Sequence, residues 1–347
     1  MLTLPVQTYG GVERIIESLA QGLAERGHEV TVFCAGGSTI SGAHISCVEI
    51  SPYPTSLHPE ETQRWEQCLF KEVMQRQREF DVIHFHFEPI VICDENGVNL
   101  LDFFTTPVVC TFHNITTIPK HQVYYRETPS LYRHTMVFIS ENQRNHVPFF
   151  PHAEVIYNAI PVEKFSYEER KENYLLFLGR ITPVKGILQA IKVARQTNTP
   201  LMIAARIDAS DQVFYEHDVK PLIDGVFIRY VGEADFDQKV TLLKRARALL
   251  FPILWEEPFG LVMIEALACG TPVIAFRRGS VPEIMKEGVT GYVVDTIEEM
   301  VESVNKIGEI SPAACRADVE QRFSQKTMIE SYEAVYRKVV HIDFHEV

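Results

Sequence analysis

The fold is decided by residues 255–279, WEEPFGLVMIEALACGTPVIAFRRG. The first six residues are polar enough to form a loop, and residues 261–268 follow as an apolar run without Gly or Pro, which predicts a helix. Gly270 and Pro272 are stop signals for that helix. Residues 273–276, VIAF, predict a short buried strand. The stretch therefore predicts a loop, a helix, a turn and a strand in succession.

Two carboxylates, Glu257 and Glu265, lie near the start of the predicted helix. A helix N-terminus carries free N–H groups and a partial positive charge, which together favour phosphate. Carboxylates accept hydrogen bonds from hydroxyl groups. The combination indicates a ligand with both hydroxyls and phosphates, and a nucleotide-sugar is the obvious one. A polar loop ahead of a core helix is the alternative interpretation.

The bulk composition indicates a two-domain globular protein. The chain has 347 residues, of which 46% are hydrophobic. It has no run of about 18 apolar residues, and no signal peptide is visible after Met1, so we expect neither a membrane span nor secretion. Seven cysteines without a C-x-x-C pair predict buried thiols in a reducing cytoplasm. A net charge of −13 argues against nucleic acid and against broad adsorption to anionic membranes.

Strand and helix patterns alternate along the whole chain, which predicts βαβ units and mostly parallel sheets. Residues 12–23 open the series with an apolar face at the helical period. A polar stretch at residues 158–173 is the best candidate for a linker. Strands are predicted at residues 29–34, 81–87, 107–113, 136–140 and 154–157 before this stretch, and at 174–178, 201–205, 226–231, 248–251, 273–276 and 292–294 after it.

The segment EEPFGLVMIEALACGTPVIA closely resembles the E-x7-E motif of the large retaining glycosyltransferase family 4. The resemblance implies an α/β protein with the GT-B fold, in which two Rossmann-like domains hold the active site in the cleft between them. We expect residues 1–160 to form the acceptor-binding domain and residues 161–323 the nucleotide-sugar-binding domain. Residues 324–347 would form a helix that crosses back to the first domain.

The implied activity is transfer of a hexosyl group from a nucleotide-diphosphate sugar to an unknown acceptor. We expect UDP as the nucleotide, with GDP as the alternative, and neither a metal nor another cofactor. The acceptor, a small molecule or a glycan, would bind through N-terminal loops such as residues 51–60 and 114–128. Nothing in these loops identifies it.

Arg180 and Lys185 stand in a GR-x4-KG pattern between a predicted strand and a predicted helix. Sugar transfer leaves negative charge on the departing diphosphate, which an Arg fork and a Lys point charge can stabilise. The pattern resembles the diphosphate clamp of the family, and it makes a metal unnecessary. A surface loop with two solvated cations is the alternative interpretation.

The resemblance also assigns roles to single residues. Glu265 is similar to the family glutamate that binds the ribose hydroxyls, and Glu257 to the one that contacts the donor sugar. His113 ends a predicted strand, at the edge where such sheets bind ligands, and we expect it to polarise the transition state rather than act as a base. A structural role is the alternative for such a histidine. Further donor contacts are expected from Gly10, Gly11, Arg206, Val231, Phe259, Gly260, Leu261 and Val262.

The mechanism implied by the family has no protein nucleophile, and the leaving phosphate takes the acceptor proton on the same face of the sugar. Two residues depart from the family pattern, because Ala159 and Ala205 stand where the family usually has Gly. Alanine narrows the approach of backbone to a ligand or changes a turn. These departures put the choice of nucleotide base in doubt more than the fold.

Other functions compete with this interpretation. His84 and His86 alternate on one predicted strand and so share a face, as the ligands of a metal-dependent hydrolase could. Asp235 and Asp237 form a D-x-D pattern that binds metal in another glycosyltransferase fold, although a helix N-cap at Asp235 is the simpler expectation. A nucleotide-sugar-binding protein without transferase activity, or a GT-B epimerase, is a further alternative.

Only nine residues precede Gly10, whereas relatives begin with an apolar strand before the corresponding loop. Residues 2–9, LTLPVQTY, already match that loop. The missing strand would be central in its sheet, and each buried backbone group left unpaired costs about 1–3 kcal/mol. We therefore expect the true start roughly a dozen residues upstream of Met1, or another segment in the place of the strand.

Overall fold

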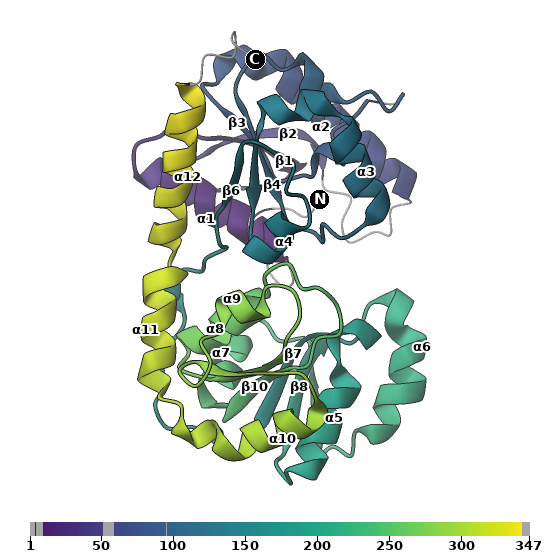
Figure 1. Ribbon diagram of the computed structural model, residues 1–347, viewed down its shortest axis with the longest axis vertical. Helices are drawn as coiled ribbons and strands as arrows, with labels where there is room; N and C mark the ends of the chain where they lie inside the picture. The colour runs from purple at the N-terminus through teal and green to yellow at the C-terminus, as the bar shows by residue number, and fades with distance from the viewer. Residues whose placement is uncertain (1–3, 5–9, 51–58, 95, 342–347) are drawn as a thin grey trace. The chain divides into compact units, whose positions relative to one another are not determined.

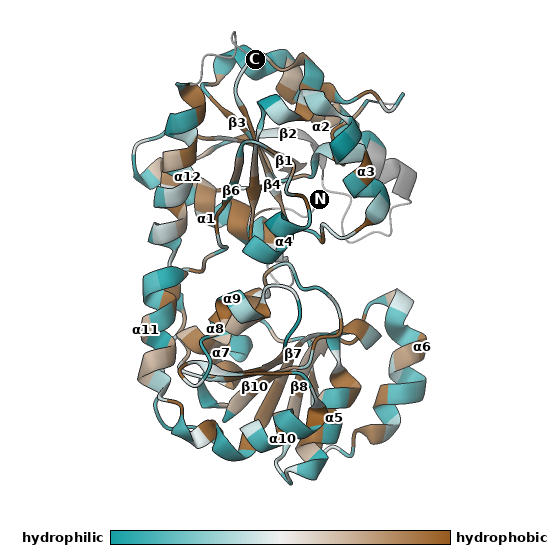
Figure 2. Cartoon of the chain, viewed as in Figure 1, coloured by the Kyte–Doolittle hydropathy of each residue, from teal (hydrophilic) through white to brown (hydrophobic). Residues whose placement is uncertain are grey.

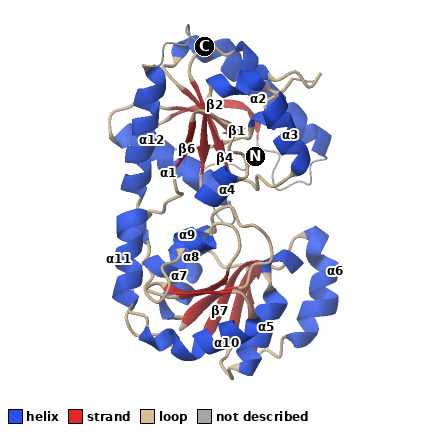
Figure 3. Cartoon of the chain, in the orientation of Figure 1, coloured by secondary structure: helices blue, strands red, loops and turns tan. Residues whose placement is uncertain are grey.

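The computed structural model describes residues 4, 10–50, 59–94 and 96–341 (Figure 1). The chain divides into two compact units. Unit 1 comprises Met1–Asn158 together with Gln325–Val347, and unit 2 comprises Ala159–Ser324. In both units, helices surround a sheet (Figure 3). The strands in the two units are largely hydrophobic, whereas many helices have hydrophilic outer residues (Figure 2).

Unit 2 is built on a six-stranded sheet whose neighbouring strands are all parallel. The strand order is β12-β11-β10-β7-β8-β9, so the direction of winding reverses between β7 and β10. Ligands of such sheets bind at the carboxyl ends of the strands beside this switch point. The strands are β7 (Leu175–Arg180), β8 (Leu201–Arg206), β9 (Ile228–Gly232), β10 (Ala248–Phe251), β11 (Val273–Phe276) and β12 (Gly291–Val294), and each overlaps a predicted strand.

Two helices of unit 2 have a boundary at a signal that the sequence provides. Helix α8 has the predicted bounds, Leu261–Ala268, and Gly270 follows it with a left-handed φ of 73°. Asp235 caps α7 through a reciprocal pair of hydrogen bonds with Gln238, which confirms the N-cap prediction. The helices are α5 (Ile187–Gln196), α6 (Gln212–Phe214), α7 (Phe236–Arg245), α8, α9 (Val281–Ile284), α10 (Ile297–Lys306) and α11 (Pro312–Arg322).

The polar stretch that was predicted as a linker packs against unit 2. Phe165 is buried, and its ring lies 5.3 Å from that of Phe236. The ammonium group of Lys171 donates hydrogen bonds to the backbone carbonyls of Lys244 and Cys269, at 2.9 and 3.0 Å. The division between the units lies earlier, between Asn158 and Ala159. Burial of Ile160, Val162 and Phe165, together with the bonds of Lys171, holds this otherwise hydrophilic segment on the domain.

Unit 1 contains two parallel sheets that no strand pairing joins within the described residues. The larger has the order β3-β4-β5-β6. The smaller pairs β1 with β2, and β2 was absent from the predicted strands because its short HISCVEI run is only partly apolar. The strands are β1 (Thr31–Gly36), β2 (His44–Ile50), β3 (Ile83–Phe85), β4 (Val108–Phe112), β5 (Thr135–Phe138) and β6 (Ala153–Val155).

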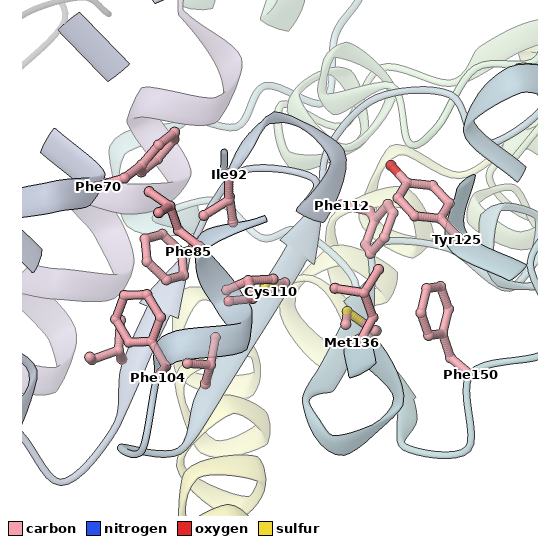
Figure 4. Packing of buried hydrophobic residues seen from close by; sticks show 14 of the residues in the cluster. Phe70, Phe85, Ile92, Phe104, Cys110, Phe112, Tyr125, Met136 and Phe150 are labelled. Atoms are coloured by element: carbon pink, nitrogen blue, oxygen red, sulfur yellow. The ribbon is translucent and has the colours of Figure 1, made fainter. Parts of the chain in front are cut away.

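An aromatic core lies beside the larger sheet of unit 1. It joins β3, β4 and β5 to the surrounding helices (Figure 4). The rings of Phe112 and Phe138 stack at 4.7 Å. Burial of several large apolar side chains stabilises the unit, at about 1.5–3 kcal/mol for each. The helices of the unit are α1 (Gly11–Glu25), α2 (Pro59–Arg76), α3 (Pro119–Glu127), α4 (Glu141–Asn145) and α12 (Gln325–Val340).

Helix α12 belongs to unit 1, although it follows unit 2 in the sequence. It packs against α1, where a Cβ added to Gly22 would lie 2.0 Å from the Cδ1 atom of Ile329. The guanidinium group of Arg26 forms two hydrogen bonds with the carboxylate of Glu333, at 2.8 and 2.9 Å. Close packing and a bidentate ion pair therefore hold α12 on its own domain.

The predicted N-terminal loop lies mostly outside the described residues, because residues 5–9 are not described. Leu4 is buried, and its backbone N–H and C=O bond to Ser38 Oγ and to the N–H of Thr39, at 3.0 and 2.7 Å.

Among the described helices, none combines the length and the apolar composition that a membrane span requires.

Candidate functional site

Two loops meet at the switch point of unit 2, one after β7 and one after β10. Gly186 ends the first loop at a left-handed φ of 76°, and a Cβ there would lie 1.9 Å from the carbonyl oxygen of Pro252. The backbone N–H of Leu254 donates to the carbonyl of Val184 at 2.8 Å. Only glycine combines this conformation with so close an approach. The GR-x4-KG loop and the loop before α8 are therefore packed backbone to backbone.

This packing pairs Lys185 with Glu257. Lys185 Nζ lies 2.7 Å from Glu257 Oε2, and the exposed fractions of the two side chains are only 17% and 11%. Trp255 completes the arrangement, because its indole N–H donates to the same carboxylate oxygen at 3.0 Å and its ring lies 4.9 Å from the ammonium group. A cation–π contact and two charge-assisted hydrogen bonds fix both charges. The expected clamp lysine and sugar-binding glutamate thus form one ion pair.

Arg180 and Arg206 share a second carboxylate. Asp208 Oδ2 lies 3.1 Å from Arg180 Nη1, and Asp208 Oδ1 lies 2.7 Å from Arg206 Nε. Burial alone would raise the pKa of Asp208, but the hydrogen bonds and charges of the two guanidinium groups outweigh it and hold that pKa below its ordinary value. The ends of β7 and β8 therefore present two arginines that both contact Asp208.

Glu265, in the middle of α8, pairs with Lys239 of α7. Both side chains are nearly buried, and the rings of Phe165 and Phe236 lie 5.6 and 5.4 Å from the ammonium group. Glu265 and Glu257 thus have different cationic partners. An ionised carboxylate held in this way is a strong hydrogen-bond acceptor for a hydroxyl group.

The start of α8 is held in place by the loop after β11. Ser280 donates from its hydroxyl to the carbonyl of Phe259 and from its N–H to the carbonyl of Glu257, both at 2.9 Å. Gly279 has a φ of 55°, and a Cβ there would lie 2.2 Å from the carbonyl oxygen of Glu257. Gly260, Leu261 and Val262 are half-buried, and no described side chain caps the helix. A helix N-terminus of this kind can receive an anion through its first N–H groups.

The residues expected near a nucleotide base lie on β8 and β9. Val231 is 42% exposed on β9, and the neighbouring Tyr230 donates its hydroxyl to the carbonyl of Ala205 at 2.9 Å. Ala205 is buried, as is Ala159 in the other position that departs from the family pattern. The two alanine side chains are therefore packed inside the unit.

In unit 1, His113 directly follows β4, and its Nε2 atom lies 3.0 Å from Nδ1 of His86. Burial lowers the pKa of His113 to about 4, so its ring is neutral at pH 7. Gly10 is the N-cap of α1, and Gly11 is the first residue of the helix. Both glycines stand at a helix N-terminus, where backbone can approach an anion.

Several residues of the site were not predicted from the sequence. Trp255 and Asp208 each stand two residues from a predicted site residue, so proximity along the chain was a signal for both. Lys239 lies in another helix and had no signal of its own. Gly279 and Ser280 act through contacts with the backbone carbonyls of Glu257 and Phe259, which a sequence pattern does not reveal.

The two histidines of the hydrolase alternative share a face, as their alternation predicts, and their ring centroids lie 4.1 Å apart. His86 bonds to His113, and His84 bonds to the hydroxyls of Tyr336 and Thr111. Across the described residues, no three His, Cys, Asp or Glu side chains are arranged to hold a metal ion. The ligand set that a metal-dependent hydrolase needs is therefore not formed there.

Two family models cover most of the chain. Residues 160–325 match the model described as Glycosyl transferases group 1, and residues 9–164 match the model described as Glycosyltransferase Family 4. An uncharacterized glycosyltransferase of Methanocaldococcus jannaschii is 28% identical over 331 residues, which cover 84% of this chain and 82% of that protein.

Solved structures share the architecture. AviGT4, a glycosyltransferase involved in avilamycin A biosynthesis, aligns with a TM-score of 0.70 and 24% identity over 98% of this chain and 93% of its own. HepE of Anabaena, solved in complex with UDP and glucose, aligns with a TM-score of 0.72 and 16% identity over 95% of this chain and 96% of its own. At these identities the likeness shows the fold alone, and the predicted GT-B fold is confirmed.

Proposed function

Because the chain belongs to the glycosyltransferases of group 1 and family 4, we propose that it transfers a hexosyl group from a nucleotide-diphosphate sugar to an acceptor, with retention of configuration. The observation that carries this proposal is the ion pair between Lys185 and Glu257 at the switch point of unit 2. The pair brings an ammonium group and a carboxylate within 2.7 Å of each other, and these are the kinds of group that bind phosphate and sugar hydroxyls.

We assign the diphosphate to Arg180, Lys185 and the first backbone N–H groups of α8. In the ligand-free protein, both cations are balanced by carboxylates, so a diphosphate oxygen can replace a carboxylate as their partner. These charges supply the stabilisation that a divalent metal provides in other transferases, and the proposed reaction therefore uses no metal. UDP is the preferred nucleotide, and the complex of HepE with UDP supports this choice.

The remaining contacts follow the chemistry of each group. Glu265 binds the ribose hydroxyls, and Glu257 binds hydroxyls of the donor sugar. Arg206 and Val231 stand near the base. In unit 1, Gly10 and Gly11 contribute backbone to the diphosphate, and His113 polarises the reacting sugar through a ring N–H.

The reaction itself needs no protein nucleophile. The acceptor oxygen forms a bond to the anomeric carbon while the bond from that carbon to the diphosphate oxygen breaks. The acceptor proton passes to the leaving diphosphate on the same face. Arg180 and Lys185 stabilise the negative charge that develops on the diphosphate, which lowers the barrier more than it stabilises the ground state.

Calorimetry with UDP tests the donor site directly. We expect UDP to bind in EDTA, and Lys185→Ala to weaken the binding about ten- to a hundredfold, because a charged hydrogen bond contributes roughly 1.5–3 kcal/mol. Lys192→Ala removes an exposed lysine of the adjoining helix α5 and serves as the matched control. Equal affinity in both variants would reject the clamp.

Transfer is tested separately from binding. A thermal-shift panel of nucleotide-sugars identifies the donor, and release of UDP from that donor without an acceptor distinguishes an enzyme from a pure binder. Activity that is lost in EDTA and restored by manganese or magnesium would contradict the proposed metal-independent reaction.

A further inference from the structure

Behind His113, unit 1 contains a continuous row of aromatic side chains that the proposed reaction does not use. His84 lies in β3 and His86 directly follows that strand, whereas Tyr336 and Tyr332 come from α12. The centroid of the His86 ring lies 5.3 Å from that of the His113 ring and 4.1 Å from that of the His84 ring. The ring of His84 in turn lies 5.1 Å from that of Tyr332. The row connects His113 to the C-terminal helix of its own unit.

The inner end of the row is fixed by hydrogen bonds. His84 uses both ring nitrogens, because Nδ1 lies 2.8 Å from the hydroxyl of Tyr336 and Nε2 lies 2.7 Å from Thr111 Oγ1. Thr111 is buried, and its hydroxyl also meets that of Tyr332 at 3.1 Å. A ring bonded at both nitrogens can neither rotate nor flip without breaking a bond. His84 is thus a rigid support for the ring of His86, which packs against it at a tilt.

The outer end of the row contains the bond between His86 and His113. Burial lowers the pKa of both rings, so both are neutral at pH 7. In a neutral pair one nitrogen donates and the other accepts. The bond occupies Nε2 of His113, and no other described residue hydrogen-bonds to this ring. Nδ1 is therefore the ring atom that His113 presents to a ligand.

We propose that His86 is a positioning residue that donates its Nδ1–H to Nε2 of His113, so that His113 carries its own proton on Nδ1. His113 then offers a hydrogen-bond donor to the reacting sugar, as the proposed function requires. With the opposite polarity, Nδ1 of His113 would be an acceptor and the residue would act as a base. The catalytic role of this hydrogen bond rests on the proposed function. The tautomer of His113, in contrast, can be determined without any substrate.

Nitrogen NMR of the ligand-free protein tests this proposal without any substrate. Long-range proton–nitrogen correlation spectra of the histidine-labelled chain show which ring nitrogen carries the proton, and the signals of His113 are assigned as those that disappear in His113→Gln. We expect protonation at Nδ1 of His113 and at Nδ1 of His86. Protonation of His113 at Nε2 would overturn the proposal.

Variants of His86 test its consequence for catalysis. An asparagine amide places a nitrogen near the position of Nδ1, so His86→Asn retains the hydrogen bond that His86→Leu removes. With UDP-glucose as the probe, we expect His86→Leu to lower kcat for UDP release on the order of tenfold, with little change in KM, and His86→Asn to recover most of it. His152→Asn, at an exposed position of the same unit, is the control.

A failure of the proposed function and a failure of the positioning role of His86 give different experimental results. If UDP does not bind to the unaltered protein in calorimetry, the proposed function fails. If UDP binds normally but His86→Leu keeps the kcat of the unaltered protein, or His86→Asn restores nothing, the positioning role is wrong. Should His86→Leu fail to fold, the spectrum of the unaltered protein still decides between the two tautomers.

Discussion

Each carboxylate of the E-x7-E motif is bound to its own cation, Glu257 to Lys185 and Glu265 to Lys239. We therefore expect separable effects of neutralising them. Glu265→Gln should weaken UDP binding about tenfold or more, since a charged hydrogen bond to ribose is lost. Glu257→Gln should chiefly lower turnover, because its sugar contact belongs to the reacting centre. Calorimetry and UDP release measure the two effects, and the reverse pattern would exchange the assigned roles.

Gly186 lies so close to another backbone segment that a side chain would not fit. Comparison with a second left-handed glycine separates this effect from the strain of the left-handed conformation. Gly186 and Gly225 both have a φ of 76°, but only Gly186 faces another backbone, the carbonyl of Pro252. Gly225→Ala should cost about 1–2 kcal/mol, the strain of a left-handed alanine. Gly186→Ala should cost about 1–3 kcal/mol more and should also weaken UDP binding, because Lys185 moves with the loop. Thermal unfolding with calorimetry checks both effects, and equal losses in the two variants would contradict the packing argument.

At the scale of elements, α12 is held on α1 by a carboxylate that is sensitive to acid. The hydrogen bond from Arg26 is the main reason that the pKa of Glu333 falls from 4.5 to about 2. A carboxyl group with a lowered pKa stabilises the fold above its unfolded value, and this stabilisation is lost as the pH falls. We therefore expect unit 1 to lose this contribution between pH 4.5 and about 2.

Two variants of α12 isolate this effect. Glu333→Gln should lower the Tm of unit 1 at pH 7 by about 2–4 °C and flatten the dependence on pH below 4.5. Glu330→Gln is the matched control, because Glu330 lies one turn away, contacts the same Arg26 at 3.8 Å and is half exposed. Solvent screens that pair, so its loss should change little. Similar losses in both variants would show that the buried position of Glu333 has no special role.

At the scale of the molecule, acid should destabilise the two units unequally. Burial lowers the pKa of several histidines in unit 1, to about 3 for His84 and about 4 for His113 and His134. The unfolded chain takes up protons near pH 6.5 and the folded unit does not, so stability falls with the pH from 6.5 downward. Unit 2 contains a single histidine, His217.

Hydrogen exchange read on separate peptides measures this difference. Between pH 7 and pH 5, we expect peptides of unit 1 to lose protection while peptides of unit 2 largely keep it, after correction for the intrinsic rate of exchange. Peptides of β4 and α12 should report the change most clearly, since they contain or contact the buried histidines. A parallel loss in both units would contradict the prediction.

Much of the fold was predictable because its signals are local. The bounds of α8 followed from an apolar run and from Gly270, and the cap of α7 followed from Asp235. Strand β2 and the docked segment around Phe165 were not predicted, because a short strand and a few scattered buried side chains leave little periodicity to detect. Residues 5–9, on which the expectation of a missing first strand depends, lie outside the described residues.

The sequence by itself determined the family, the fold class and most residues of the candidate donor site, because the E-x7-E and GR-x4-KG motifs are contiguous. Only the tertiary structure decided the partners of those residues. Glu257 meets Lys185 and Glu265 meets Lys239 across 72 and 26 positions of the chain, and His113 meets His86 across 27. A pairing between distant segments depends on strand order and on close backbone approach, such as that of Gly186 to Pro252. Neither the strand order nor the close backbone approach can be deduced from the spacing of the paired residues along the chain.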